Sequence, residues 1–526
     1  MKIHTIIFGL HWLTKLDLLR LLLVSVLGWL ATPECAVARS WTGDGETNVV
    51  KLWSNPANWT PQGVPQNGED LWFGGTLSPD LLMVNDLPNL TVRSLRFAME
   101  DIGDVAGHLY GNTLGISQGI FNTNYFECQV YIHCGVRLTG NATFVTGNPD
   151  YNSFFGEDVT MHISGPIDLN GHNLVLFADS DFRDTGRMYI QGGILGVGNV
   201  LAIAGGLGGG ATDYYESSLE FSGTGNDFTG ALTLDSRLNS EILLNLSSGV
   251  VVNDLLILTN VGDVKLLRAN QIGDAATVRL KDGATLQLNG YSDTILNLEL
   301  ITDSNDSRPA VLDTFHFSWS VLSAGTLSVA GNITSICNNG AQTPAIKGIL
   351  NLLSGSHDIN VSGSVYAGLD IQAQMMGVGN FSKSGAQALL LTASNSFNST
   401  ISILKGVLDV RNNHALGDIV GSTEIFEGNL TLRNVAIGAE SLFALGGSEG
   451  EFPGAALTSI GISSWSGQVL LNTNLVVTGD MSFTGSISGT GGMGCFGGGT
   501  IRLGGLLANN VAVQFLHNLM GRERFV

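Results

Sequence analysis

The sequence is poor in charge, in basic residues and in cysteine. Only 13% of its 526 residues are charged, against about a quarter in ordinary globular domains. Lys and Arg number 24 and Asp and Glu 45, giving a net charge of −21. Binding to nucleic acid requires clustered Lys and Arg, so we expect no nucleic-acid partner. The composition instead indicates an acidic protein whose surface is largely Ser, Thr, Asn and Gly.

Metal and disulfide frameworks are also missing. No C-x-x-C pair or Cys/His zinc spacing occurs, and no H-x-H or H-x-x-x-H pair exists, so the sequence predicts no metal site and no cofactor. Cys128 and Cys134 fall in one expected strand, roughly 20 Å apart, and cannot pair unless that strand folds back. We expect Cys128, Cys134, Cys337 and Cys495 to be structural thiols, and their pairing stays open.

The segment 1–38 has the layout of a secretory signal. Lys2, Lys15 and Arg20 precede and flank an apolar run, LLLVSVLGWLA, and Ala36-Val37-Ala38 fits the rule for cleavage after small residues. The run is too short to span a bilayer comfortably. We therefore expect export, a mature chain beginning at Arg39 and no transmembrane segment after the signal is removed.

Glycine is abundant, with 70 residues, and proline is scarce, with 11. No G-X-Y period exists, which excludes collagen, and 44% hydrophobic residues argue against disorder. Short runs of alternating polarity, separated by Gly, Asn, Asp and Ser, recur along the chain, for example TLSVAGN at Thr326–Asn332. This alternation predicts β-strands. The nearest candidate for a helix is the short stretch Ala439–Gly447.

Internal repeats indicate the architecture. MYIQGGILGVGN ends at Asn199 and LDIQAQMMGVGN ends at Asn380, and their matched positions keep one constant offset. Downstream, both copies place an Asn two positions before a Phe. These pairs are Asn226 with Phe228 and Asn395 with Phe397.

Repeated strands predict an all-β fold, a parallel β-solenoid (right-handed β-helix). Inward side chains would stack into one long core, and corner Asn residues could adopt positive φ or bond to their equivalents in the next coil. At roughly 20–25 residues a coil, the chain supplies about twenty coils and a rod roughly 100 Å long. The expected divisions are a signal at 1–38, a cap with the first strands at 39–100, a solenoid at 101–505 with repeats at 377–418, 196–290 and 486–505, and an atypical tail at 506–526.

Tryptophan is concentrated near the start of the mature chain. Trp41, Trp53, Trp59 and Trp72 lie close together in the sequence, and only Trp319 and Trp465 follow. A solenoid has open ends with uncovered core, so we expect this segment to form an N-terminal tryptophan-rich cap. The alternative is a platform of Trp53, Trp59 and Trp72 on which sugar rings stack.

The N-terminal pattern W-x-G…W-x-x-x-x-N-W…G-x-P-x-x-x-D-x-x-x-F resembles that of large exported bacterial proteins carrying autotransporter-associated β-strand repeats. It stands here as Trp41 to Gly43, Trp53 to Trp59, Gly63 to Pro65 and Asp70 to Phe73. The repeat G-x-G-x-x-x-K-x-G-x-x-x-L-x-L-x-x-x-N-x-[FY] is best kept at Gly377–Val410, with Lys383, Gly385, Leu389, Leu391, Asn395, Phe397 and Gly406.

The resemblance covers about half the mature chain and implies a β-helical passenger on the outside of a bacterium. Two departures from it matter. Neither a barrel domain nor a C-terminal sorting signal is recognisable. In addition, the third repeat stops within its motif. We expect a shortened version of a longer passenger, the alternative being that Leu506–Val526 folds over the last strand edge.

Catalytic patterns are nearly absent, and we expect no catalytic, cofactor-binding or metal residues. The densest charged cluster, Ala178–Arg187, contains Asp179, Asp181 and Asp184. These could hold Ca²⁺ beside an Arg acting as base, as in some polysaccharide lyases of this fold class. A polar loop facing water is the preferred interpretation, since the cluster has no repeated partner.

The sequence therefore favours an exported structural or adhesive protein of the cell surface, without catalysis, whose ligand is unknown and could be a polysaccharide or another cell. The alternatives are a carbohydrate-active enzyme on a β-helix and a carbohydrate-binding protein.

Overall fold

The computed structural model describes most of the chain beyond the expected signal. The described residues are 38–44, 50–75, 81–99, 105–123, 128–147, 158–181, 184–206, 217–303, 308–317, 322–338, 342–446, 455–496, 499–508, 511–515 and 524–525. The predicted signal at 1–38 lies outside this part except for Ala38. Trp319 and the side chains of Asp181 and Asp184 also lie outside it.

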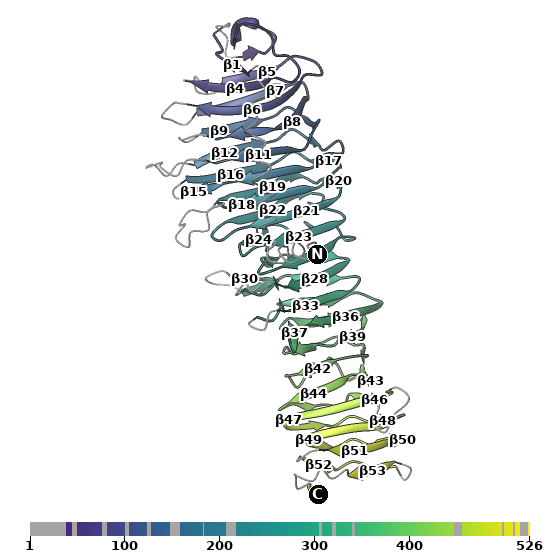
Figure 1. The fold of residues 1–526 in the computed structure, drawn as a ribbon. Coiled ribbons are helices and arrows are strands. Elements are labelled where there is room, and N and C mark those ends of the chain that lie inside the picture. Colours follow the sequence, from purple (N-terminus) through teal and green to yellow (C-terminus); the bar gives the residue numbers. More distant parts are fainter. Residues whose placement is uncertain are drawn as a thin grey trace, which may run out of the picture.

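The molecule is an elongated rod of stacked coils (Figure 1). Two long sheets, here called sheet A and sheet B, run its length, and a short sheet C contains β27 (Asp293–Ile295), β32 (Thr326–Val329), β35 (Ile349–Leu352) and β38 (Gln374–Gly377). The one helical element in the described part is a 3-10 turn, Pro56–Asn58. The prediction of an all-β parallel solenoid is confirmed.

Sheet A is built from parallel strands that follow one another from coil to coil. In order these are β4 (Asp70–Gly75), β6 (Thr91–Met99), β8 (Leu114–Asn122), β11 (Ala142–Thr146), β14 (Leu174–Ala178), β18 (Val200–Ala204), β21 (Ala231–Ser236), β23 (Leu255–Thr259), β25 (Thr277–Lys281), β28 (Asn297–Thr302), β33 (Ile333–Cys337), β36 (Ser356–Gly363), β39 (Asn380–Ser384), β41 (Thr400–Ile403), β43 (Ser422–Ile425), β46 (Ser441–Ala444), β48 (Val469–Leu471) and β50 (Ile487–Gly489).

Sheet B is built in the same way on another side of the rod. Its parallel strands are β2 (Val50–Leu52), β5 (Leu81–Asn85), β7 (Val105–Gly111), β9 (Cys128–Ile132), β12 (Asp158–Ile163), β16 (Asp184–Ile190), β19 (Ser218–Thr224), β22 (Glu241–Ser248), β24 (Asp263–Leu266), β26 (Thr285–Gln287), β29 (Val311–Asp313), β34 (Ala345–Lys347), β37 (Ala367–Ile371), β40 (Ala388–Leu391), β42 (Val407–Val410), β44 (Asn429–Arg433), β47 (Ala455–Trp465), β49 (Leu475–Phe483), β51 (Gly492–Phe496) and β53 (Ala512–Phe515).

Alternation along each strand sends apolar side chains into one continuous core. Leu389 pairs with Leu408, and Leu408 pairs with Leu430, and all three side chains are fully buried. Each apolar residue thus rests on its equivalents in the coils above and below, as expected for a solenoid.

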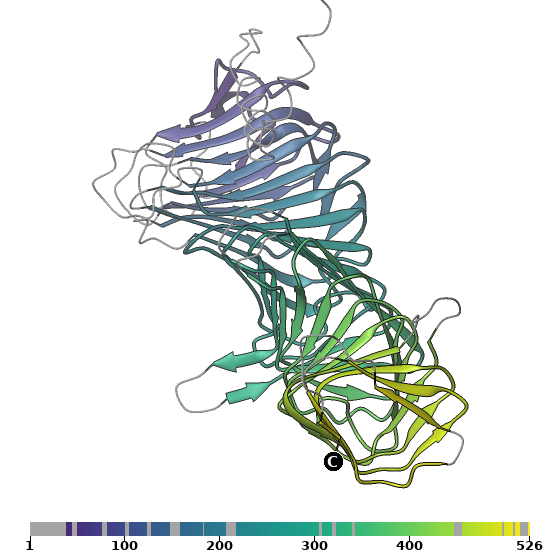
Figure 2. The same ribbon diagram turned by 60° about the horizontal axis from the view of Figure 1, so that its bottom comes forward.

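One segment differs from the expected structure, and one hairpin departs from simple coil stacking. Ala439–Gly447, the candidate for a helix, contains β46 instead, because Leu442 and Ala444 alternate inward and complete the sheet A ladder. An antiparallel hairpin of β30 (Phe315–Phe317) and β31 (Leu322–Ala324) projects from the side of the rod (Figure 2).

The tryptophan-rich cap is present at the N-terminal end. β1 (Ala38–Trp41) pairs in parallel with β4 and antiparallel with the short edge strand β3 (Trp59–Thr60). Trp41, Trp53 and Trp59 are buried, and their rings pack with Phe73. Large aromatic rings thus cover the core that the first full coil leaves open.

The two repeat copies have equivalent structures at their Asn and Phe positions. The Asn226 amide accepts from the Ile194 N–H and donates to the Val251 carbonyl. Asn395 does the same with Met375 and Ala415. We expected equivalent Asn side chains to bond to one another. Asn226 and Asn395 instead bond to backbone groups of the coils on either side.

The other repeat positions are buried as well. Phe228 and Phe397 are 3% and 1% exposed. Lys383 is fully buried, and its ammonium donates to the carbonyls of Ser384, Gly385 and Lys405. This lysine therefore joins adjacent coils from inside the rod, although burial lowers its pKa to about 8.

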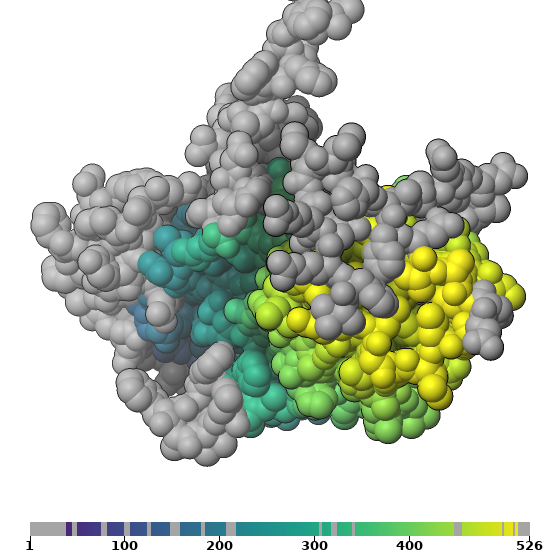
Figure 3. Space-filling model, turned by 90° about the horizontal axis from the view of Figure 1, so that it is seen from below, coloured from purple at the N-terminus to yellow at the C-terminus, as the bar shows by residue number. Residues whose placement is uncertain are grey.

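At the C-terminal end the described part of the tail continues sheet B beyond the predicted boundary at Gly505. β53 pairs in parallel with β51, and β54 (Arg524–Phe525) pairs with β52 (Thr500–Leu503). Figure 3 looks along the rod from this end, where the last coils lie in front of the earlier ones.

Candidate binding surface

A column of large side chains stands on the outer face of sheet A near the cap. Register pairs Trp72 of β4 with Arg96 of β6, and Arg96 with Phe121 of β8. The Arg96 guanidinium carbon lies 5.5 Å from the Trp72 ring centroid and 4.7 Å from that of Phe121. Such cation–π contacts hold the rings in place. Trp72 remains 41% exposed.

The alternative interpretation, a sugar-stacking platform of Trp53, Trp59 and Trp72, is therefore wrong for two of the three residues. Trp53 and Trp59 are 0% and 2% exposed, so neither ring can meet a ligand. Leu71 and Phe73 point inward on either side of Trp72, and the period of two along a strand forces Trp72 outward. Trp72 belongs to the outer surface and takes no part in the cap.

A second aromatic column lies on the outer face of sheet B, along β7, β9, β12 and β16. Register stacks His108, Tyr131, His162 and Tyr189 on one another. Successive ring centroids are 4.5, 4.4 and 4.6 Å apart, with planes within 11° of parallel. We call these four residues the His–Tyr ladder. Their ring faces cover each other, so the ladder presents ring edges to solvent.

The rings of Tyr110 and His133 lie beside the His–Tyr ladder. Tyr110 stacks on His133 at 4.2 Å, and His133 Nε2 lies 3.1 Å from His108 Nδ1. His133 Nδ1 lies 2.8 Å from the Ser164 hydroxyl. Sequence spacing did not reveal this cluster, because its histidines come from different coils and are distant from one another in the chain.

Two histidines of this aromatic surface resist protonation. Burial, and after it the neighbouring His133 and His108, lower the pKa of His162 to about 4. The pKa of His133 is also lowered, by burial and then by His108. The imidazoles of His133 and His162 are therefore neutral at pH 7, which suits close stacking on Tyr rings.

Acidification should destabilise this part of the rod. The folded pKa of His162 is below the ordinary value of 6.5, so its stabilising contribution is present above pH 6.5 and is lost as the pH falls through 4. After allowance for partial exposure we expect a loss of about 1–3 kcal/mol in unfolding free energy. Urea unfolding between pH 7 and 4, comparing wild type with His162→Gln and with His172→Gln as a control outside the ladder, measures it. An identical decline in all three proteins would contradict the assignment.

Two buried carboxyl groups, those of Glu440 and Asp293, have pKa values above the ordinary range. Burial raises the pKa of Glu440 to about 8, against the lowering effect of the Thr423 hydroxyl bond. Burial likewise raises the pKa of Asp293 to about 6, although it accepts backbone N–H bonds from Gln271 and Ile272. Each carboxyl satisfies groups at a coil corner, and we assign both a structural role.

The predicted acidic cluster at Ala178–Arg187 contains one antiparallel strand pair. β15 (Ser180–Asp181) pairs antiparallel with the start of β16. Asp179 is half-buried, and the side chains of Asp181 and Asp184 fall outside the described part. Arg187 forms a half-exposed ion pair of 3.1 Å with Asp158. Within the described ranges no three His, Cys, Asp or Glu side chains are placed to hold a metal ion.

Four cysteines of the described part, Cys128, Cys134, Cys337 and Cys495, are buried. Burial raises the pKa of the Cys128 and Cys134 thiols to about 12, which leaves them protonated and unreactive at neutral pH. They therefore contribute packing rather than chemistry.

No helix among the described residues has the length and hydrophobicity needed to cross a membrane. No family model, curated protein or solved structure matches the chain.

Proposed function

We propose that the protein is an exported, elongated structural or adhesive protein of the bacterial surface, which binds its ligand through the outer face of the solenoid. The signal pattern at 1–38 and the resemblance to autotransporter-associated repeats support export to that surface. The rod supports a role in which length and repeated surface matter more than a pocket (Figure 1).

The exposed Trp72 is the single observation that carries a binding role. The indole ring is 41% exposed on a parallel sheet, and although Arg96 lies over one of its faces, it offers apolar surface of the kind that pyranose rings contact. Arg96, half-buried beside it, adds hydrogen-bond donors to the same column. We therefore propose a polysaccharide as the ligand at this end of the rod.

Replacement of Trp72 with alanine should weaken polysaccharide binding by about tenfold or more, because interface tryptophans commonly contribute over about 1 kcal/mol. The measurement is retention on immobilised bacterial, plant and algal polysaccharides. Tyr291→Ala is the matched control, since Tyr291 is 39% exposed in a coil far from Trp72. Equal retention of the Trp72→Ala and Tyr291→Ala proteins would remove Trp72 from the proposal.

A further inference from the structure

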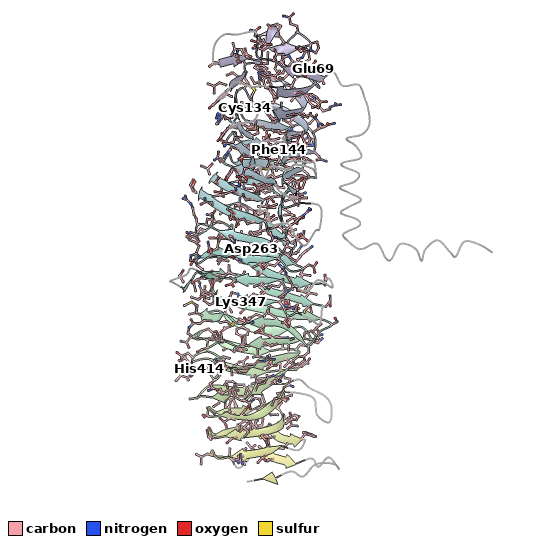
Figure 4. The ribbon with its side chains drawn as sticks, turned by 90° about the vertical axis from the view of Figure 1, so that its left-hand side faces the viewer. Glu69, Cys134, Phe144, Asp263, Lys347 and His414 are labelled. Atoms are coloured by element: carbon pink, nitrogen blue, oxygen red, sulfur yellow. The ribbon has the colours of Figure 1, made fainter. Side chains whose placement is uncertain are left out.

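Two arginines stand side by side on the outer face of sheet B in the C-terminal half. Val410 of β42 pairs with Leu432 of β44, so Arg411 and Arg433 are neighbours on adjacent coils. Like charges in this position repel one another. His414, labelled in Figure 4, shows the position of these coils along the rod.

Both guanidinium groups are held by one carboxylate. The Asp409 side chain is fully buried beneath them. Arg433 Nε donates to both of its oxygens at 2.8 and 2.9 Å, and Arg411 Nη2 donates to Oδ2 at 3.2 Å. The Asp409 contact raises the pKa of Arg433, so the guanidinium stays charged and fixed in position.

Among the described residues, the two arginines share one carboxylate, so the site has a local charge of +1 in a chain of net charge −21. The neighbours of Asp409 in its own column are Leu390 and Thr431, so neither adjacent coil supplies a second carboxylate there. Elsewhere in the described part, each ion pair joins one cation to one carboxylate, except at Lys265, where one ammonium pairs with the carboxylates of Glu241 and Asp263. Two cations sharing one carboxylate distinguish this site.

An exposed phenol completes the site. The Tyr366 hydroxyl lies 3.4 Å from Asp409 Oδ2 and also contacts Arg433, and Tyr366 is 48% exposed. The Arg411 and Arg433 side chains are 38% and 30% exposed. Both arginine side chains are therefore partly open to solvent beside the exposed Tyr366.

We propose that Arg411, Arg433 and Tyr366 bind the anionic group, carboxylate or sulfate ester, of an acidic sugar. Planar guanidinium forks match these oxyanions in pairs of hydrogen bonds, and the Tyr366 ring offers a face for the sugar. This assignment rests on the proposed function for its biological meaning, because it names acidic polysaccharides as the class to which the rod adheres.

The test uses Arg411→Gln, which removes one guanidinium and leaves Asp409 paired with Arg433, so folding should be preserved. Arg268→Gln is the matched control: Arg268 is exposed and donates to the neutral Asn245 amide. Calorimetry with a soluble oligogalacturonate and with a sulfated oligosaccharide tells the two anions apart. We expect one of them to bind the full chain, and binding to fall about tenfold in Arg411→Gln but not in Arg268→Gln.

Three results would overturn the assignment: no binding of either oligosaccharide, equal binding by the Arg411→Gln variant, or equal binding of a neutral oligosaccharide of the same length. Failure of the proposed function gives a different result. The wild-type protein would then bind the charged oligosaccharide through Arg411, but wild type and Trp72→Ala would be retained equally on the immobilised polysaccharides.

Discussion

Replacement of Trp59 with alanine is expected to lower the free energy of unfolding of the N-terminal coils by about 3–5 kcal/mol. Its ring is 2% exposed and lies 4.7 Å from Trp41, 5.6 Å from Trp53 and 5.9 Å from Phe73, centroid to centroid. Its Nε1 also donates to the Trp53 carbonyl at 3.0 Å. Truncation would open a cavity at the end of the core, where the short edge strand β3 gives little support.

The loss should be confined to that end, because each coil of a solenoid contacts only its neighbours. Hydrogen exchange should speed up in β4 and β6 and stay unchanged in β47 and β49. Trp72→Ala is the control, since Trp72 lies one position from the core but faces outward. Unaltered protection of β4 in the Trp59→Ala protein would show that Trp59 does not cap the rod.

Replacement of Phe397 with alanine is expected to cost about 3–5 kcal/mol in its own part of the rod. Phe397 is 1% exposed and packs edge-to-face on Phe381 at 5.7 Å. The change would leave a cavity behind the corner that Asn395 holds, and the two backbone bonds of that amide would lose their support.

Thermal unfolding with exchange readout of β39 and β41 measures this effect. Phe228→Ala is a matched variant, because Phe228 occupies the equivalent corner of the first repeat copy. Both variants should lose protection only in their own coils. An unchanged unfolding profile for Phe397→Ala would mean that the corner assignment is incorrect.

Much of the fold could be predicted from the sequence because the solenoid repeats one simple rule. Alternation predicted a strand in Thr326–Asn332, where Leu327 and Val329 are fully buried, and the matched repeat copies identified equivalent corners at Asn226 and Asn395. Both corners are buried as the pattern predicted. The hydrogen-bond partners of these amides could not be predicted, because they depend on which backbone groups the coils above and below leave unpaired.

The candidate surfaces were harder to predict because they depend on coil length. His108 and His133 become neighbours only if the intervening coil has the right number of residues, and the same holds for Arg411 and Arg433. Variable loops between strands change that number from coil to coil. Trp72 is different, because its outward direction could be predicted from the alternation with Leu71 and Phe73. Its position close to three other tryptophans in the sequence favoured a shared role in the cap instead.

We propose that the rod binds polysaccharide and leaves it intact. The most direct measurement incubates the purified protein with plant, algal and bacterial polysaccharides and follows both retention of the protein and release of sugar. Retention that depends on Trp72, with no new reducing ends and no unsaturated products, is the predicted result. Steady release of unsaturated or reducing sugars by the wild-type protein would contradict it and would indicate a carbohydrate-active enzyme.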